Sequence, residues 1–212
     1  MTPNSTTRPR IDEDDDDEEC EAEGKAKDVA NFLGKGLLEQ RIIMVAKPVD
    51  RELAAGVVSQ LLILDAQDST KPITMYVNCP GGDADSGFGI YDAMNFISAP
   101  VTTVCLGLAA SAAVIIFVGG AKGKRFTLPH SRFLIHQPSS YSQGQASDIE
   151  ITANEIVKTR DLYNKILAAE SNRTEKQILK DVNRDFWLNA DEAVDYGIAS
   201  SVIQTMGDLP KG

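Results

Sequence analysis

The chain has 212 residues and a formal net charge of −10, with 42% hydrophobic and 25% charged residues. This length and composition are those of a soluble globular protein with one folded core. The excess of acids disfavours a nucleic-acid partner, because binding to phosphates depends on Lys and Arg.

The acids are concentrated at the N-terminus. Residues 1–28 hold eleven Asp and Glu against four Lys and Arg, and the block 12–19 is acidic throughout. Such a block repels itself and has nothing to bury, so we expect it to be disordered. It could be a solubilising tail or an interaction segment, and the sequence leaves both open. We therefore expect an acidic tail at 1–28, one folded domain at 29–204 and a C-terminal tail at 205–212.

The cysteines and the apolar segments bear on the compartment. Cys20, Cys79 and Cys105 are widely spaced and odd in number, which fits neither a disulfide framework nor a zinc site. The N-terminus carries acids where an export signal has bases and an apolar run. The most apolar segment, 104–118, is shorter than the roughly 20 residues that a membrane helix needs. We expect a reducing, cytoplasmic location and no membrane partner.

Strands and helices are predicted to alternate along the chain. Short β-branched runs such as 41–45 are typical of buried strands, whereas the apolar residues of 53–64 recur at helical spacing. The remaining predicted strands are 73–77, 101–106, 125–128, 132–135, 186–188 and 201–203. The predicted helices are 32–38, 50–67, 86–97, 111–118, 147–170, 174–182 and 189–197. Asp50, Thr174 and Asn189 are expected to cap three of them, and Gly197 to end the last. This alternation predicts an α/β fold with a mainly parallel sheet and helices on its faces. The helix at 147–170 is unusually long, so part of it should project from the core or meet another subunit.

Ser111 has small neighbours in the segment 107–137, and His136, near the end of that segment, follows an apolar strand. A serine in such a run is either a small residue in tight packing or a nucleophile. A nucleophile also needs a base, an orienting acid and donors for an oxyanion. His130 and His136 are the available histidines, and His136 is at a strand end, where functional residues of α/β folds gather.

Two backbone amides are candidate oxyanion donors. Gly82 follows a strand in a glycine turn, and Ala112 begins the helix after Ser111. The glycines do not form a phosphate loop, since no Gly-Lys-Ser/Thr follows. Ser111 is also outside a Gly-x-Ser-x-Gly elbow, so these patterns alone leave packing and catalysis both open.

Several linked motifs resemble those of the ClpP family, the proteolytic subunits of Clp proteases, over about 39–203. The turn 78–82 resembles the family's N-S-P-G-G, and 109–111 resembles its nucleophile segment. The other similar segments are 90–97, 120–126, 128–129, 131–132, 135–138, 143–146, 148–151, 184–186, 191–194 and 196–197. The order and spacing of these segments match those of the family.

The resemblance implies a catalytic triad in which Ser111 is the nucleophile, His136 the general base and Asp185 the acid that orients the imidazole. It implies Gly82 and Ala112 as the oxyanion donors. The implied activity is a serine endopeptidase for unfolded polypeptides, dependent on ATP through a partner, with no cofactor bound by this chain.

The resemblance also implies an architecture. The expected fold is ClpP/crotonase-like, with repeated ββα units and a protruding handle helix at 147–170. The handle would join two stacked heptameric rings of this chain, possibly mixed with a paralogue, around a closed chamber. An AAA+ unfoldase of the ClpX or ClpA/ClpC kind would deliver polypeptide. Residues 139–142 would lie beside the active site and pair with the substrate backbone.

The chain departs from the family pattern in four regions. The family usually has Gln at Leu108, Met at Ala112 and an aromatic residue near Thr74, and it has a glycine-rich strand where 139–141 reads Ser-Ser-Tyr. The N-terminus lacks a counterpart of the apolar axial loop, which weakens the expectation of unfoldase docking. Two alternatives therefore stay open: a catalytically silent or regulatory ring subunit paired with an active paralogue, and a crotonase-type acyl-CoA enzyme.

Overall fold

The computed structural model describes residues 32–210, so the predicted tail at 1–28 lies outside the described residues. The chain divides into two units, 1–40 and 41–212. In the first unit, residues 32–39 are helical, which agrees with the helix predicted at 32–38. The second unit carries all the other elements and every candidate site residue.

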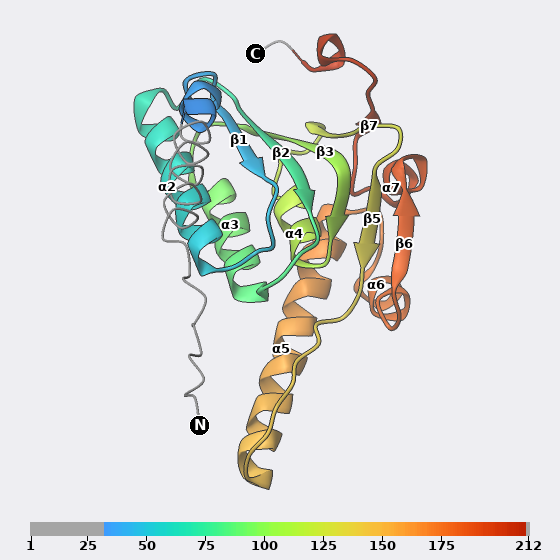
Figure 1. The fold of residues 1–212 in the computed structure, drawn as a ribbon. Coiled ribbons are helices and arrows are strands. Elements are labelled where there is room, and N and C mark those ends of the chain that lie inside the picture. The colour runs from blue at the N-terminus through green and yellow to red at the C-terminus, as the bar shows by residue number, and fades with distance from the viewer. Residues whose placement is uncertain (1–31, 211–212) are drawn as a thin grey trace, which may run out of the picture. The chain divides into compact units, whose positions relative to one another are not determined.

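The described residues of the second unit contain a seven-stranded sheet (Figure 1). Its main path is β1-β2-β3-β4-β7 and all of these pairs are parallel, which confirms the predicted mainly parallel sheet. β5 pairs with β3 in parallel and with β6 in antiparallel orientation. The strand bounds are β1 Ile42–Val45, β2 Ile73–Cys79, β3 Val101–Ala110, β4 Arg125–Thr127, β5 Arg132–Ile135, β6 Phe186–Asn189 and β7 Ser201–Val202.

β3 is longer than predicted and pairs with two strands in succession. Its first half pairs with β4 and its last residues, Leu108 to Ala110, pair with β5. Gly107, between the halves, has a φ of 93°, and a Cβ there would lie 3.3 Å from the Asn78 side-chain oxygen. The prediction of a strand end at Leu106 was wrong because this glycine redirects the strand without ending it.

Three helices pack together beside the strands β1, β2 and β3. They are α2 Arg51–Gln67, α3 Ala84–Phe96 and α4 Ala112–Val118, with α3 in contact with both of the others. Every residue of α4 is buried, which confirms 112–118 as core. The rest of the predicted core segment is buried at 104–105 and 109–110, whereas Gly107 is exposed and Leu106 and Leu108 are half-buried. Asp50 accepts from the Leu53 amide at 2.7 Å and so caps α2 as predicted.

The long helix α5, Ala146–Glu170, extends well beyond the sheet in Figure 1. It has no buried residue before Tyr163, so its first half projects, as predicted from its length. Its end is fixed to the sheet by Glu170, whose carbonyl accepts from Arg125 at 2.8 Å and whose carboxylate accepts from Tyr91 at 3.1 Å. The same carboxylate forms an ion pair with Arg125. No helix in the described residues is long and apolar enough to cross a membrane.

The last helices begin and end where capping residues predict. α6, Glu175–Asp181, opens with a capping box between Thr174 and Gln177, and α7, Ala190–Tyr196, opens with one at Asn189. Gly197 ends α7 in the left-handed conformation, with a φ of 91°. These helices flank β6, and Met206–Asp208 form a final 3₁₀ turn.

Candidate active site

Ser111 forms the turn between β3 and α4. Its φ of 55° and ψ of −121° lie outside the regions that L residues favour. The turn is held because the Ser111 amide donates to the Leu134 carbonyl at 2.8 Å and the Ser111 carbonyl accepts from the Val114 amide at 2.9 Å. The predicted helix at 111–118 is therefore wrong by one residue: α4 starts at Ala112, and Ser111 is the strained residue before it.

The turn around Gly81 and Gly82 packs directly against the Ser111 turn. A Cβ at Gly81 would lie 2.8 Å from the Cβ of Ser111, and a Cβ at Gly82 would lie 2.2 Å from the Val49 carbonyl oxygen. Backbone bonds hold the glycine turn against Val49, since the Val49 amide donates to the Gly81 carbonyl and the Val49 carbonyl accepts from the Asp83 amide, both at 2.8 Å. The small residues that predicted tight packing are thus the ones that bring two backbones together at Ser111.

The amides of Gly82 and Ala112 both belong to this contact. Within residues 32–210, neither amide donates a hydrogen bond to another part of the chain. Both residues line the same cavity as Ser111. The cavity is thus lined by two residues whose N–H groups are unused in the described residues, and an oxyanion hole requires such donors.

His136 and Asp185 are brought together by the pairing of β5 with β6. Ile135 is opposite Phe186 in the antiparallel register, so the residue after β5 lies beside the residue before β6. The distance from His136 Nδ1 to Asp185 Oδ1 is 3.2 Å. The pair is open to solvent, because the His136 side chain is 30% exposed and the Asp185 side chain 65%.

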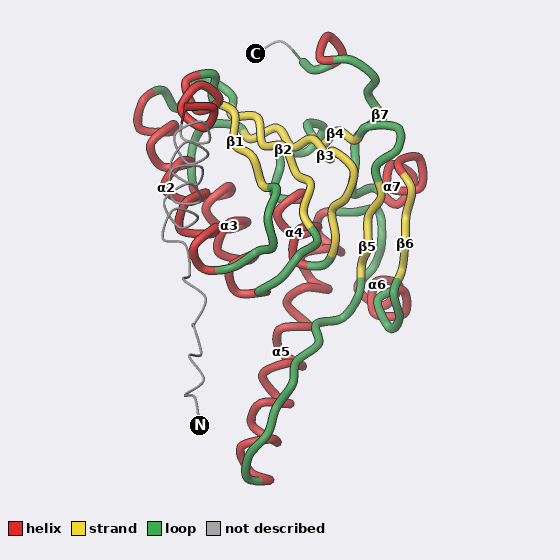
Figure 2. The backbone as a smooth tube through the Cα atoms, in the orientation of Figure 1, coloured by secondary structure: helices red, strands yellow, loops and turns green. Residues whose placement is uncertain are grey.

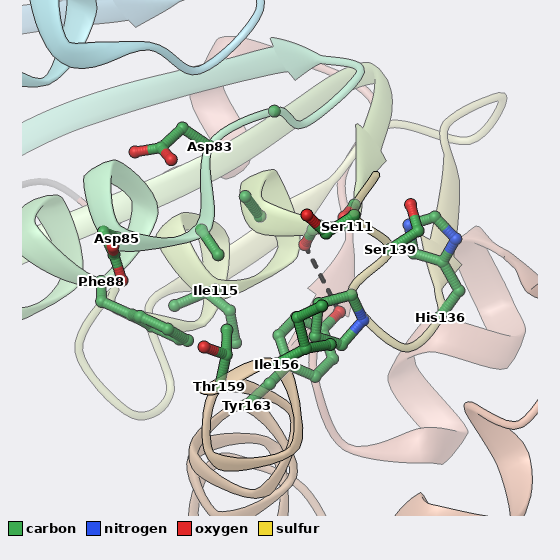
Figure 3. A pocket seen from close by; sticks show the side chains of 15 residues that line it. Asp83, Asp85, Phe88, Ser111, Ile115, His136, Ser139, Ile156, Thr159 and Tyr163 are labelled. Carbon is green, nitrogen blue, oxygen red and sulfur yellow. Dashed lines mark hydrogen bonds between the residues drawn. The ribbon is translucent and has the colours of Figure 1, made fainter. Parts of the chain in front are cut away.

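One cavity of about 310 Å³ joins most of these groups (Figure 3). Ser111 and His136 both line it, but no hydrogen bond between them is found in the described residues. Figure 3 shows Phe88 and Ile115 on one side, His136 on the other, and Ser111 between them. Catalytic contacts are often long before substrate binds, so the open Ser111–His136 contact does not exclude catalysis.

Further groups complete the lining of the cavity. Ser139 and Ser140 come from the connection 136–145, which has no helix or strand and runs alongside α5 (Figure 2). Asp83 and Asp85 contribute carboxylates from the start of α3. Hydrogen bonds from the Ser86 side chain and amide lower the pKa of Asp83, which caps α3.

The structure brings four predicted site residues, Ser111, His136, Gly82 and Ala112, to one cavity. Asp185 does not line that cavity, but it lies behind His136 in an adjoining surface pocket. His130, the other histidine considered, is exposed in the turn between β4 and β5.

Sequence reasoning missed Tyr163 of α5. Its hydroxyl donates to the Ser111 carbonyl at 3.4 Å, and it lines the cavity. Burial raises its pKa far above the usual value for a phenol. The only local signal was an aromatic residue on the apolar face of a long helix, which is more often a packing residue than part of a site.

Comparison with known proteins gives two consistent findings. The sequence matches the Clp protease family over residues 24–206. The structure is similar to that of a point mutant of ClpP1 from Listeria monocytogenes, with a TM-score of 0.76 and 36% sequence identity. The match covers 82% of this chain and 98% of that one. It confirms the predicted α/β fold of ClpP type, and the chain belongs to the Clp protease family.

Proposed function

We propose that this chain is a serine endopeptidase in which Ser111 is the nucleophile, His136 the base and Asp185 the orienting acid. The observation that carries the proposal is the meeting, at one cavity, of a strained serine, a histidine held by a carboxylate and two unused amides. An acyl-CoA enzyme of the crotonase type would not need the His136–Asp185 pair, so the pair favours the peptidase.

The chemistry assigns one task to each group. With its Nδ1 proton donated to Asp185, His136 keeps Nε2 to accept the proton of the Ser111 hydroxyl. The serine oxygen attacks the peptide carbonyl, and the amides of Gly82 and Ala112 stabilise the oxyanion that forms. His136 then passes the proton to the leaving amine, and water hydrolyses the acyl-enzyme by the same route.

The substrate would bind as an extended strand along residues 139–142. This segment has no helix or strand of its own, and Ser139, Ser140 and Tyr141 are exposed. Its backbone groups are therefore open to pairing with a peptide, which gives affinity without a demand on side-chain sequence. Such binding suits an enzyme for unfolded polypeptides.

The proposed assembly is two stacked heptameric rings of this chain, possibly with a paralogue, in the cytoplasm. The exposed apolar residues of α5 support an assembly, because Ile151 is 62% exposed and Ile149, Val157 and Leu162 are also exposed. Apolar groups gathered on a projecting helix are typical of a surface that another subunit covers. An AAA+ unfoldase would supply polypeptide and use ATP, with no cofactor in this chain.

Labelling with a fluorophosphonate tests the activity. The purified wild-type protein should react at Ser111, and Ser111→Ala should abolish the label and lower peptide turnover by about 10³- to 10⁶-fold with its assembly intact. Ser98→Ala removes a serine hydroxyl beyond the other end of α3 and should retain the label. Equal turnover by Ser111→Ala and wild type would rule out the proposal.

A silent or regulatory ring subunit is the second candidate function. The observation in its favour is the missing hydrogen bond between Ser111 and His136 in the described residues. In that case the purified homomer would not label, whereas rings mixed with an active paralogue would label. Separation of the assemblies by size before labelling distinguishes the two functions.

A further inference from the structure

We propose that Tyr163 is a positioning residue for the oxyanion hole, whose hydroxyl holds the Ser111 carbonyl and thereby directs the Ala112 amide at the substrate. The inference rests on the proposed peptidase function and adds a group from α5 to it. The contact is the hydrogen bond from the Tyr163 hydroxyl to the Ser111 carbonyl oxygen at 3.4 Å, drawn as a dashed line in Figure 3.

The Ser111 carbonyl and the Ala112 N–H belong to a single peptide unit. That unit is planar and trans, so its carbonyl and N–H point in opposite directions and rotate together. A donor that fixes the carbonyl oxygen therefore fixes the direction of the N–H. A hydrogen bond to the carbonyl also polarises the unit, which strengthens its N–H as a donor.

The strained conformation of Ser111 needs contacts that hold it, and the Tyr163 hydrogen bond is one of them. Ser111 has a φ of 55°, and such a conformation persists only when its surroundings hold it. The side chains of Ala110 and Ala112 carry no polar group, and α4 is apolar throughout. Among the described residues, Tyr163 makes the side-chain hydrogen bond to this backbone, alongside the backbone donation from Val114 at 2.9 Å.

The environment of Tyr163 favours the same assignment. Its side chain is buried, at 5% exposure, and a buried phenol is stable only with a partner for its hydroxyl. In the described residues that partner is the Ser111 carbonyl. Burial raises the pKa of Tyr163, so the hydroxyl keeps its proton and remains a donor at any pH at which the protein works.

The position of the hydroxyl is fixed through α5. Glu170 follows Tyr163 by about two helical turns and is bonded to Arg125 of β4 and Tyr91 of α3. The helix that carries Tyr163 is therefore anchored to the sheet close to the site. Movement of α5 at this anchor would change the position of the Tyr163 hydroxyl and with it the direction of the Ala112 amide.

Tyr163→Phe is the direct test, because it removes the hydroxyl and keeps the ring that fills the space. Loss of a whole oxyanion donor lowers kcat about 10²- to 10³-fold, and here the amide stays but loses its direction, so we expect kcat to fall about 10-fold. KM should change less than about twofold. The carbonyl of the bound substrate, before attack, depends less on the Ala112 N–H than the oxyanion of the transition state does. Affinity for a peptide aldehyde, whose adduct carries an oxyanion, should weaken in proportion to kcat/KM.

Tyr196→Phe is the matched control. Tyr196 is 3% exposed, and its hydroxyl donates to the Asp181 carboxylate at 2.9 Å and not to the Ser111 backbone. It should keep wild-type kcat and aldehyde affinity, even where its thermal stability falls. An unchanged kcat and aldehyde affinity in Tyr163→Phe would overturn the inference. Equal losses in both variants would also overturn it, because they would indicate general loosening of the fold.

The two proposals fail in different ways. A wild-type protein that neither labels nor turns over peptide, alone or in mixed rings, contradicts the peptidase function itself. A wild-type protein that is active, with a Tyr163→Phe variant that is equally active, contradicts only the positioning role. Thermal unfolding and assembly size, measured on each variant, confirm that the comparison is made between folded rings.

Discussion

The candidate site has two halves that are built differently. The nucleophile half consists of Gly82, Ser111 and Ala112. The glycine turn is closely packed here, with Gly81 against Ser111 and Gly82 against the Val49 backbone. The base half consists of His136 and Asp185 at the ends of β5 and β6, joined by a single contact of 3.2 Å and open to solvent. Added side-chain atoms in the glycine turn should therefore affect folding together with activity. Changes in the second half should affect activity more than folding.

Loss of the base should lower activity as much as loss of the nucleophile. His136→Ala removes the proton acceptor and should lower kcat/KM by about 10³- to 10⁶-fold. Its melting temperature should fall less than that of a fully buried substitution, because the side chain is 30% exposed. Kinetics and thermal unfolding on the same preparation check both statements. His130→Ala, in the exposed turn between β4 and β5, is the matched control and should keep full activity.

Asp185→Asn tests the residue of the base half whose change should lower activity less. The asparagine side chain has the size of the aspartate but no longer holds the His136 imidazole in the required tautomer. In a buried triad this change costs about 10⁴-fold in kcat, and the Asp185 side chain is 65% exposed, so we expect a smaller loss of about 10²- to 10³-fold. A loss as large as that of His136→Ala would show that assembly buries the pair and would remove the contrast between the two halves.

Gly82→Ala tests the nucleophile half through the fold. Its Cβ would lie 2.2 Å from the Val49 carbonyl oxygen, and the backbone φ of 149° is unfavourable for alanine. We expect a loss of about 3 kcal/mol or more in the free energy of unfolding, measured with denaturant. Gly89→Ala is the control, since nothing lies within 4 Å of its added Cβ. It lies within α3 and should increase stability by up to about 1 kcal/mol.

Local features of the chain could be predicted from sequence, whereas the conformation of the site could not. The caps at Asp50, Thr174 and Asn189 were predicted correctly because each depends on residues three positions apart. The φ of Ser111 was not predicted, since it depends on contacts with Leu134 and Gly81.

Contacts between residues far apart in the sequence could not be predicted from local sequence patterns. The proximity of His136 to Asp185 depends on the β5–β6 register, and only the family resemblance suggested it. The Tyr163 hydroxyl bonds a carbonyl 52 residues away, so no local pattern indicates it. The elements could thus be predicted from sequence, whereas the site required the tertiary fold.

The smallest expected effect concerns Asp83, at the edge of the nucleophile half. Its carboxylate accepts from the Ser86 amide at 2.8 Å, and hydrogen bonds from Ser86 lower its pKa. A lowered folded-state pKa means that the stabilisation is complete above the usual aspartate pKa of about 4, and is lost as the pH falls through the lower folded value. Asp83→Ala should lose about 1 kcal/mol at neutral pH, the usual value of an N-cap.

Asp83→Asn separates the cap from the charge. Asparagine is an equally good N-cap, so this variant should keep nearly all of the stability at neutral pH. It cannot titrate, so its stability should fall less than that of the wild type below about pH 4. Because Asp83 is exposed, the difference should be under about 1 kcal/mol, measured by denaturant unfolding from pH 7 down to pH 3. Equal acid sensitivity of the two proteins would mean that the α3 cap makes no electrostatic contribution to holding Gly82 at the site.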